Sequence, residues 1–212
     1  MEITRNCLEV MLKWKHPVGI ITKNSLVLRD LDILKELASM NLVKVHLSIT
    51  SLSEKTRQLL EPRTASIKNR LKTLEILSVN KVPVYVMMAP IISSLNSHEI
   101  LPLVKKVAEL GALDVGYTMV RLNGQVANIF RDWLYKTIPD SAERILNQIA
   151  KTHGGTLNES SFNTRMRGEG VIAQQINQTM TLAKKKYLKG RTILTLNKSH
   201  YLAIKNPQMK LF

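Results

Sequence analysis

Short apolar segments that fit β-strands alternate with amphipathic segments that fit α-helices over the first 122 residues. The strand-like segments are residues 18–22, 43–50, 82–92 and 114–122. One helical pattern precedes the first segment, at residues 3–14, and others follow the first three segments, at residues 30–40, 65–79 and 100–110. A strand and its helix take about 30 residues, as in a parallel sheet with right-handed crossovers. We therefore expect an α/β fold with about four parallel strands and helices outside.

The second strand alternates between apolar and polar residues. Its apolar face would carry Val43, Val45, Leu47 and Ile49. Its polar face would carry Lys44, His46, Ser48 and Thr50. In an isolated sheet the polar face would meet water, whereas in a barrel wrapped by helices it would line the interior. A polar barrel interior would provide a ligand cavity.

The pattern changes after residue 122. Helical patterns continue at residues 126–135, 142–150 and 171–187, and a polar loop lies at 152–163. We expect three parts: a partial barrel over 1–122, a helical region over 123–190 and a basic tail over 191–212. The tail contains weak strand-like pieces and several lysines.

Charge points to a polyanionic partner. The net charge is +15, and ten Lys and Arg residues lie in 165–212, where Glu169 is the only acid. Such a field favours nucleic acid through phosphate neutralisation and counterion release. The alternative is a basic surface without a partner.

The same sequence argues against several classes of protein. The longest apolar run is far short of the roughly 20 residues of a membrane span, and the first residues do not resemble a signal peptide, so we expect a cytoplasmic protein without membrane contact. The single cysteine, Cys7, excludes an intramolecular disulfide and a cluster held by thiolates of this chain alone. No glycine-rich phosphate loop, Ser-His-Asp arrangement or metal-binding His pair is found.

Polar residues follow each strand, where ligands bind in parallel α/β folds. They are Thr22, Lys23, Ser48, Thr50, Arg121 and the segment 93–96. A lysine and a serine at adjacent strand ends could hold the carboxylate of an amino-acid-like ligand. Thr22 and Ser48 could equally be ordinary turn residues.

Two further groups have both a structural and a functional interpretation. Asn96 and Glu99 have the spacing of a helix N-cap and its capping-box partner, which we favour over a functional role. Glu61 and Arg63, with the basic helix containing Arg70 behind them, could contact phosphate or carboxylate.

These motifs together resemble the DNA repair photolyases, the radical S-adenosylmethionine enzymes related to spore photoproduct lyase. The resemblance rests on Thr22-Lys23, Leu47-Ser48-Ile49-Thr50, Leu60-Glu61-Pro62-Arg63 with Arg70, and Met88-Ala89-Pro90-Ile91-Ile92. Further matching segments are residues 26–30, 96–99 and 165–170. The resemblance runs from about residue 3 to 183. Each motif alone is weak, but the combination in this order is specific.

The resemblance implies a partial (β/α)6 TIM-like barrel with S-adenosylmethionine across the strand carboxyl ends. Lys23 and Ser48 would hold the methionine carboxylate end, and Ala89 and Pro90 would edge the cofactor pocket. Thr50, Glu61 and Arg70 also match motif positions. Substrate or phosphate contacts would come from Glu61, Arg63, Arg70, Arg121, Arg165 and Arg167.

Family enzymes reduce S-adenosylmethionine at a [4Fe-4S] cluster held by a Cys-x3-Cys-x2-Cys loop and produce a 5′-deoxyadenosyl radical. That loop is absent from this sequence, whose four strands match the third to the sixth of the barrel. We therefore expect a fragment that is inactive alone, with a separate polypeptide carrying the cluster and the first two strands. The sequence also departs from the related branch of the family in two loops. Ser93-Ser94 stands where that branch often has Pro-Gly, and Asn123-Gly124 stands where Leu-Pro is usual.

Two alternatives stay open beside that interpretation. One is a non-enzymatic nucleic-acid-binding protein that keeps the basic surface and has lost the chemistry. The other is an unrelated α/β enzyme with a similar arrangement of strand ends.

Overall fold

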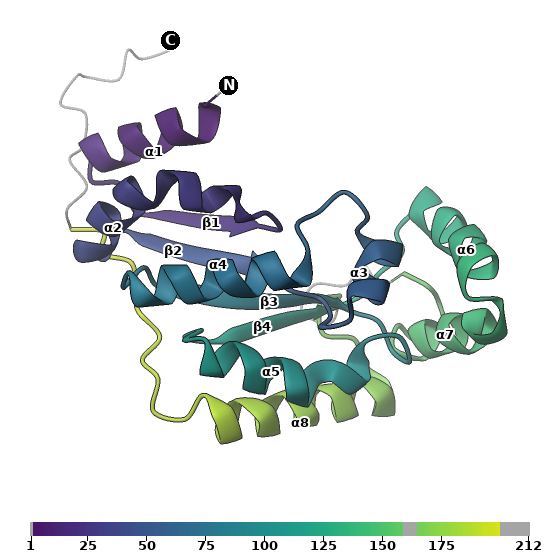
Figure 1. Cartoon of the computed structure of the whole chain (residues 1–212). Helices are drawn as coiled ribbons and strands as arrows, with labels where there is room; N and C mark the ends of the chain where they lie inside the picture. The colour runs from purple at the N-terminus through teal and green to yellow at the C-terminus, as the bar shows by residue number, and fades with distance from the viewer. Residues whose placement is uncertain (1, 159–164, 200–212) are drawn as a thin grey trace, which may run out of the picture.

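A four-stranded parallel sheet forms the centre of the molecule. The computed structural model describes residues 2–158 and 165–199. The strands are β1 (Val18–Thr22), β2 (Val43–Ser48), β3 (Val84–Ile91) and β4 (Val115–Met119). They lie side by side in chain order, and all three pairings are parallel (Figure 1). The α/β fold with about four parallel strands is confirmed, and it is compatible with a partial TIM-like barrel.

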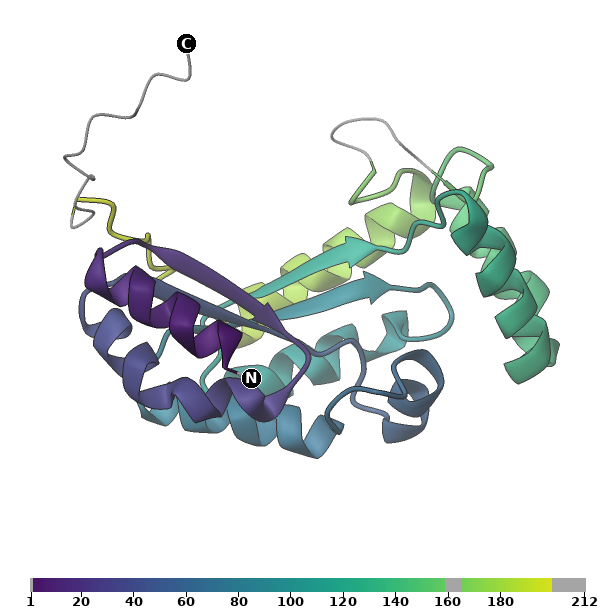
Figure 2. The same ribbon diagram turned by 90° about the horizontal axis from the view of Figure 1, so that it is seen from above.

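Helices precede and connect the strands, and a layer of helices covers one side of the sheet. They are α1 (Ile3–Lys13), the 3-10 helix η1 (Ser25–Asp30), α2 (Leu31–Ser39), α3 (Glu54–Leu60), α4 (Ile67–Val79), the 3-10 helix η2 (Ser97–Glu99) and α5 (Ile100–Glu109). Figure 2 shows the sheet curved over α2, α4 and α5. Because all three strand pairings are parallel, the carboxyl ends of the strands lie along one rim of the sheet.

The main core lies between the sheet and this helical layer. The apolar face predicted for β2 is buried, because Val45 and Leu47 pack with helix residues such as Leu34, Leu74 and Leu103. Strand residues alternate between faces, so the opposite face carries the predicted polar residues.

The opposite face of the sheet is less apolar. It carries His46, whose ring stacks on Tyr85 with the ring centroids 5.0 Å apart. Burial and the neighbouring charge of Lys44 lower the pKa of His46. Ile21 of β1 is 71% exposed on this face. The expected division between an apolar outer and a more polar inner face is therefore present.

The later helices contribute to two cores. Helices α6 (Gln125–Thr137) and α7 (Pro139–Lys151) form a second apolar cluster with residues that follow β3 and β4, including Ile92 and Leu122. Helix α8 (Gly170–Tyr187) instead packs along α5, and its Ile176 and Met180 join the core of the sheet.

The first residues after α8 run along the amino edge of the sheet. Arg191 donates to the carbonyls of Ala108 and Ala112, and the amide of Leu194 donates to the hydroxyl of Tyr85 at 3.1 Å. Residues 192–199 contain no strand, and the remainder of the predicted tail, 200–212, lies outside the described residues. None of the described helices is long and apolar enough to cross a membrane.

Candidate functional site at the strand carboxyl ends

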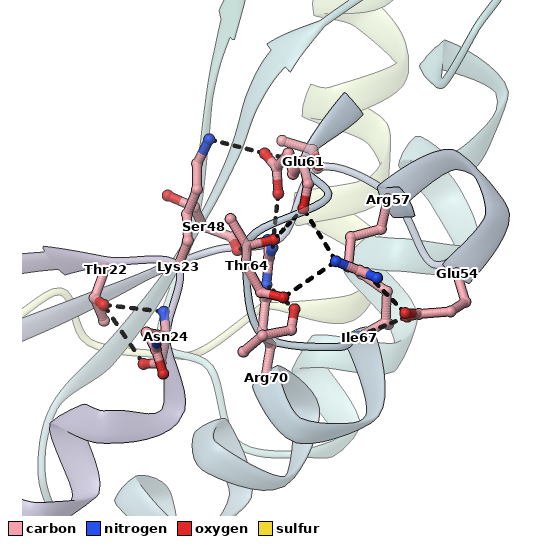
Figure 3. Close-up of polar contacts among 12 residues, drawn as sticks. Thr22, Lys23, Asn24, Ser48, Glu54, Arg57, Glu61, Thr64, Ile67 and Arg70 are labelled. Carbon is pink, nitrogen blue, oxygen red and sulfur yellow. Dashed lines mark hydrogen bonds and ion pairs between the residues drawn. The ribbon is translucent and has the colours of Figure 1, made fainter. Parts of the chain in front are cut away.

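Glu61 joins residues from three separate segments at the carboxyl ends of β1 and β2 (Figure 3). Its Oε1 lies 2.8 Å from Nζ of Lys23, which follows β1, and 3.5 Å from Oγ1 of Thr50, which follows β2. Its Oε2 accepts a hydrogen bond from Nη2 of Arg70 in α4 at 2.7 Å. The carboxylate is buried and therefore acts as a fixed anchor for these side chains.

Arg70 is the most deeply placed member of the cluster, with no exposed surface. Its Nε donates to the carbonyl of Ala65 at 2.9 Å, Nη1 donates to the carbonyl of Ser48 at 2.8 Å, and Nη2 also contacts Oγ1 of Thr64. Four of the five guanidinium donors are thereby engaged by protein acceptors. In this arrangement Arg70 positions Glu61 and the end of β2, and it presents no surface to a phosphate.

A second arginine, which the sequence did not single out, supports the loop that holds Glu61. Arg57 of α3 is buried, and its Nη1 donates to the carbonyls of Glu61 and Thr64 at 3.0 and 3.1 Å. Its Nε donates to Glu54 at 2.7 Å, while the other oxygen of Glu54 accepts from the amide of Ile67. The only signal in the sequence was the i,i+3 spacing of Glu54 and Arg57, which is common on helices.

Opposing influences act on the pKa of Glu61. Burial by itself raises the pKa of this carboxyl, but hydrogen bonds from Lys23 and Arg70 and their positive charges outweigh that effect. The net pKa lies below the usual range, so Glu61 is ionised at neutral pH. An ionised Glu61 keeps the Lys23 ammonium at the rim.

The residues expected to hold the cofactor occupy neighbouring strand ends. Lys23 is 44% exposed, and Ser48 is the last residue of β2, on the inner face with His46. Ala89 and Pro90 lie near the end of β3, half-buried and joined by a cis peptide bond. Thr50 is 1% exposed and turned to Glu61.

Thr22 forms part of a local turn, which was one of the two interpretations of this residue. Its Oγ1 accepts a hydrogen bond from the amide of Asn24 at 3.0 Å, and Oδ1 of Asn24 accepts from the amide of Leu26. Asn24 therefore caps η1. This local turn fixes the direction in which the chain leaves β1 and places Lys23 at the rim.

The capping-box hypothesis for Asn96 and Glu99 is wrong in its contacts. Asn96 makes no side-chain cap; it accepts from the amide of Ile92 at 2.7 Å and donates to the carbonyls of Thr50 and Pro90. These bonds connect the loops after β2 and β3.

Glu99 makes the second connection between the same loops. Its Oε1 accepts from the hydroxyl of Ser51 at 2.6 Å, and Oε2 accepts from the amide of Leu52. Glu99 is buried, so these bonds satisfy a carboxylate that burial would otherwise destabilise. Asn96 and Glu99 therefore have the structural role that we favoured over a functional one. They fulfil it through contacts between loops and not by capping a helix.

The remaining predicted arginines do not join the Glu61 cluster. Arg63 is exposed beside it, and Arg121 is half-buried beyond β4. Arg165 is half-buried before α8, and the guanidinium of Arg167 lies 6.0 Å from the ring centroid of Tyr117. These positions leave Arg63 as the exposed cation nearest in sequence to Glu61.

The described residues do not fit an iron-sulfur cluster. Cys7 is the sole cysteine of the sequence and lies exposed on α1, and no three His, Cys, Asp or Glu residues within 2–158 and 165–199 are grouped to hold a metal. A cluster of this kind needs several thiolates.

Comparison with known proteins identifies the family. The family model of the radical SAM superfamily matches residues 2–107, half of the chain. The chain therefore belongs to the radical SAM superfamily. The superfamily implies S-adenosylmethionine and a [4Fe-4S] cluster as cofactors.

Similar proteins occur in archaea and bacteria. Uncharacterized protein MJ0683 of Methanocaldococcus jannaschii is 30% identical over 149 residues, which cover 70% of this chain and 54% of that protein. Uncharacterized protein Rv2578c of Mycobacterium tuberculosis and Mb2609c of Mycobacterium bovis are each 26% identical over 130 residues, 60% of this chain and 38% of those proteins. The chain thus spans about half or less of the length of these relatives.

Proposed function

We propose that the carboxyl ends of β1, β2 and β3 bind S-adenosylmethionine. The observation that carries the proposal is the Glu61 cluster, which fixes a half-exposed Lys23 ammonium beside the end of β2 in a chain of the radical SAM superfamily. Lys23 and Ser48 would bind the carboxylate of the methionine part. Ala89 and Pro90 would border the ligand through their backbone.

Within this proposal Thr50 and Arg70 have a different role from the ligand contacts Lys23 and Ser48, although Ser48 is itself only 6% exposed. Thr50 and Arg70 are almost fully buried and contact Glu61, so they position it. Glu61 in turn holds Lys23, whose amine has further donors for a ligand carboxylate. Radical chemistry would be supplied by S-adenosylmethionine together with its cluster.

Binding can be measured directly by calorimetric titration of the 212-residue chain with S-adenosylmethionine and with S-adenosylhomocysteine. Replacing Lys23 by Ala removes the proposed ion pair and is expected to weaken binding of both about tenfold. Lys35→Ala, which changes an exposed lysine of α2, serves as the matched control. Equal affinities of the two variants would rule out Lys23 as a ligand contact.

We further propose a DNA repair photolyase-like activity whose cluster is bound by polypeptide outside these 212 residues. The resemblance of the strand-end motifs supports the first part, and the single cysteine supports the second. The chain alone would then be inactive. Anaerobic reconstitution with iron and sulfide is expected to give no cluster absorption with this chain alone, and to give it once a polypeptide with the three-cysteine loop is added. Formation of a [4Fe-4S] cluster on the isolated chain would contradict the proposal.

The second candidate is a nucleic-acid-binding protein without radical chemistry. The observation that favours it is the group of exposed lysines at the end of α8 and just beyond it, Lys185, Lys186 and Lys189. Because α8 packs in the core of the sheet, removing everything after residue 151 would disrupt the fold. Neutralising these lysines by substitution with Gln is the sharper test.

The triple lysine variant is expected to bind duplex DNA more weakly and with a smaller dependence on salt than the parent chain. An equal number of exposed lysines on the helical layer, Lys35, Lys68 and Lys72 changed to Gln, provides a matched control. Equal weakening in both variants would assign binding to total charge and not to α8.

A further inference from the structure

A cavity of about 570 Å³ lies away from the Glu61 cluster, none of whose residues lines it. It is open to solvent and is bordered by three segments: the loop after β3 with the beginning of α5, the middle of α7, and the first half of α8. Figure 1 shows α7 next to the ends of α5 and α8 that border this cavity. Its volume is within the range of pockets that bind small organic ligands.

One wall of the cavity contains an unsatisfied hydroxyl. Ser93 lines it, is 2% exposed, and its Oγ has no hydrogen-bond partner among residues 2–158 and 165–199. Buried polar groups are almost always paired, so an orphaned hydroxyl in a cavity wall indicates a missing partner. The adjacent Ser94 is held by a 2.7 Å hydrogen bond to Gln148 of α7.

The charge of the lining suits an anion. Arg144 of α7 is an exposed residue that lines the cavity. It forms no ion pair with a carboxylate in the described part of the chain. The residues that line the cavity include no Asp or Glu. The first turns of α5 and α8 also border the cavity through Ile100 and Ile172, and the N-caps of these helices are Glu99 and Glu169. These carboxylates oppose the partial positive charge of the helix N-termini, so the attraction for an anion comes from Arg144.

The remaining lining is apolar. Leu101 of α5 and Ile176 of α8 face the cavity beside Ile100 and Ile172. A bare inorganic ion would leave most of this surface uncovered, whereas a ligand with a phosphate and an organic body would contact both parts. Phosphate offers more acceptor positions than carboxylate to the serine hydroxyls and the guanidinium.

We propose that this cavity binds an organic phosphate of about mononucleotide size, with the phosphate between Arg144 and Ser93 and the organic part on the isoleucines. The site is separate from the proposed S-adenosylmethionine site. The loop that supplies Ser93 nevertheless begins directly after β3, and Asn96 ties the same loop to the end of β2. A ligand here would therefore contact an element that also shapes the rim.

The test is calorimetric titration of the full chain with uridine 5′-monophosphate, uridine and inorganic phosphate at constant ionic strength. Uridine 5′-monophosphate is expected to bind more tightly than either part alone. Arg144→Ala is expected to weaken its binding about tenfold, and Ser93→Ala several-fold. Arg131→Ala, an exposed arginine of α6 outside this cavity, and Lys23→Ala at the strand ends are expected to leave it unchanged.

Two results would overturn the proposal. One is equal weakening by Arg144→Ala and Arg131→Ala, which would show binding to total charge only. The other is loss of binding in Lys23→Ala, which would place the nucleotide at the strand ends. Amide resonances of residues 93–99 and 172–179 are expected to shift on addition of uridine 5′-monophosphate, and shifts confined to residues 22–24 and 48–50 would contradict it.

Discussion

Arg70 donates a hydrogen bond from Nη2 to Oε2 of Glu61 across 2.7 Å, and the arginine side chain of this ion pair is fully buried. The pair connects helix α4 to the loop that leads into it and, through Lys23, to the end of β1. Loss of either partner leaves a buried charge without its counterion, which is more costly than loss of an exposed ion pair.

Replacing Arg70 by Ala is therefore expected to lower the free energy of unfolding by about 3 kcal/mol or more. The variant also leaves the carbonyls of Ala65 and Ser48 without their donor. Chemical denaturation monitored by circular dichroism measures the change. Arg63→Ala, an exposed arginine of the same loop, is expected to change the free energy by less than about 0.5 kcal/mol. Similar losses of unfolding free energy in the two variants would show that the buried ion pair contributes no more to stability than the exposed arginine.

Glu61 also makes stability depend on pH. Its pKa in the folded chain is lowered below the unfolded value of about 4.3, so the unfolded chain takes up its proton first as pH falls. The contribution is complete above the unfolded pKa and is lost as pH falls through the folded pKa. Glu61→Gln is expected to flatten the decline of unfolding free energy below about pH 5. An unchanged acid profile would contradict this assignment.

A surface carboxylate provides the contrast. The pKa of Asp32 is lowered to about 2, chiefly by its hydrogen bond from Arg5, and the pair is exposed. Its contribution to stability is lost only as pH falls toward about 2, and we expect added salt to reduce it because exposed charges are screened. The effect of Glu61→Gln is expected to persist in salt, since Glu61 is buried.

The regular elements could be predicted well from the sequence because each has a clear hydrophobic period. The strand predicted at 18–22 has the same bounds in the structure, and the strand predicted at 82–92 spans Val84–Ile91. The helix predicted at 171–187 begins one residue earlier. Periodicity reports which face of an element is buried, but it does not report which element covers that face. The packing of α8 on α5 was therefore not foreseen.

The candidate site was predicted as a set of strand-end residues, but not as a network. Lys23 and Glu61 are 38 positions apart, and their ion pair depends on how the loop after α3 folds back. Asn96 and Glu99 have a spacing that also fits a helix cap, so local pattern could not distinguish the cap from the contacts between loops. The role of Arg57 depends on hydrogen bonds to backbone carbonyls, and no pattern of side chains in the sequence predicts such bonds.

Asn96 is expected to be essential for the connection between the loops after β2 and β3. Its side chain is fully buried and satisfies three backbone groups. Asn96→Ala leaves these groups unpaired and is expected to cost about 3 kcal/mol of unfolding free energy. Asn123→Ala, at an exposed asparagine after β4, is the control and is expected to be nearly neutral. Equal stabilities would show that water replaces the amide without cost.

Ser94 occupies a backbone conformation that favours glycine, with φ at 63°. A side chain in this left-handed region costs roughly 1 kcal/mol compared with glycine. Ser94→Gly and Ser94→Ala both lose the hydrogen bond to Gln148, but only the glycine variant relieves the backbone. We expect Ser94→Gly to be more stable than Ser94→Ala by about 1 kcal/mol in thermal denaturation. The reverse order would show that Ser94 is not held in this conformation in solution.

Strand β1 forms an edge of the sheet and is expected to mediate association. It pairs with β2 and has no second partner among the strands of residues 2–158 and 165–199, while Ile21 within it is 71% exposed. An open strand edge with an exposed apolar side chain pairs readily with another chain, and a charge placed there opposes pairing.

Ile21→Lys is therefore expected to reduce self-association across a concentration series in sedimentation velocity. Val79→Lys, which changes an apolar residue 76% exposed on α4, is the matched control and should leave association unchanged. If the parent chain sediments as a monomer at every concentration, the edge of β1 is protected in solution and the prediction fails.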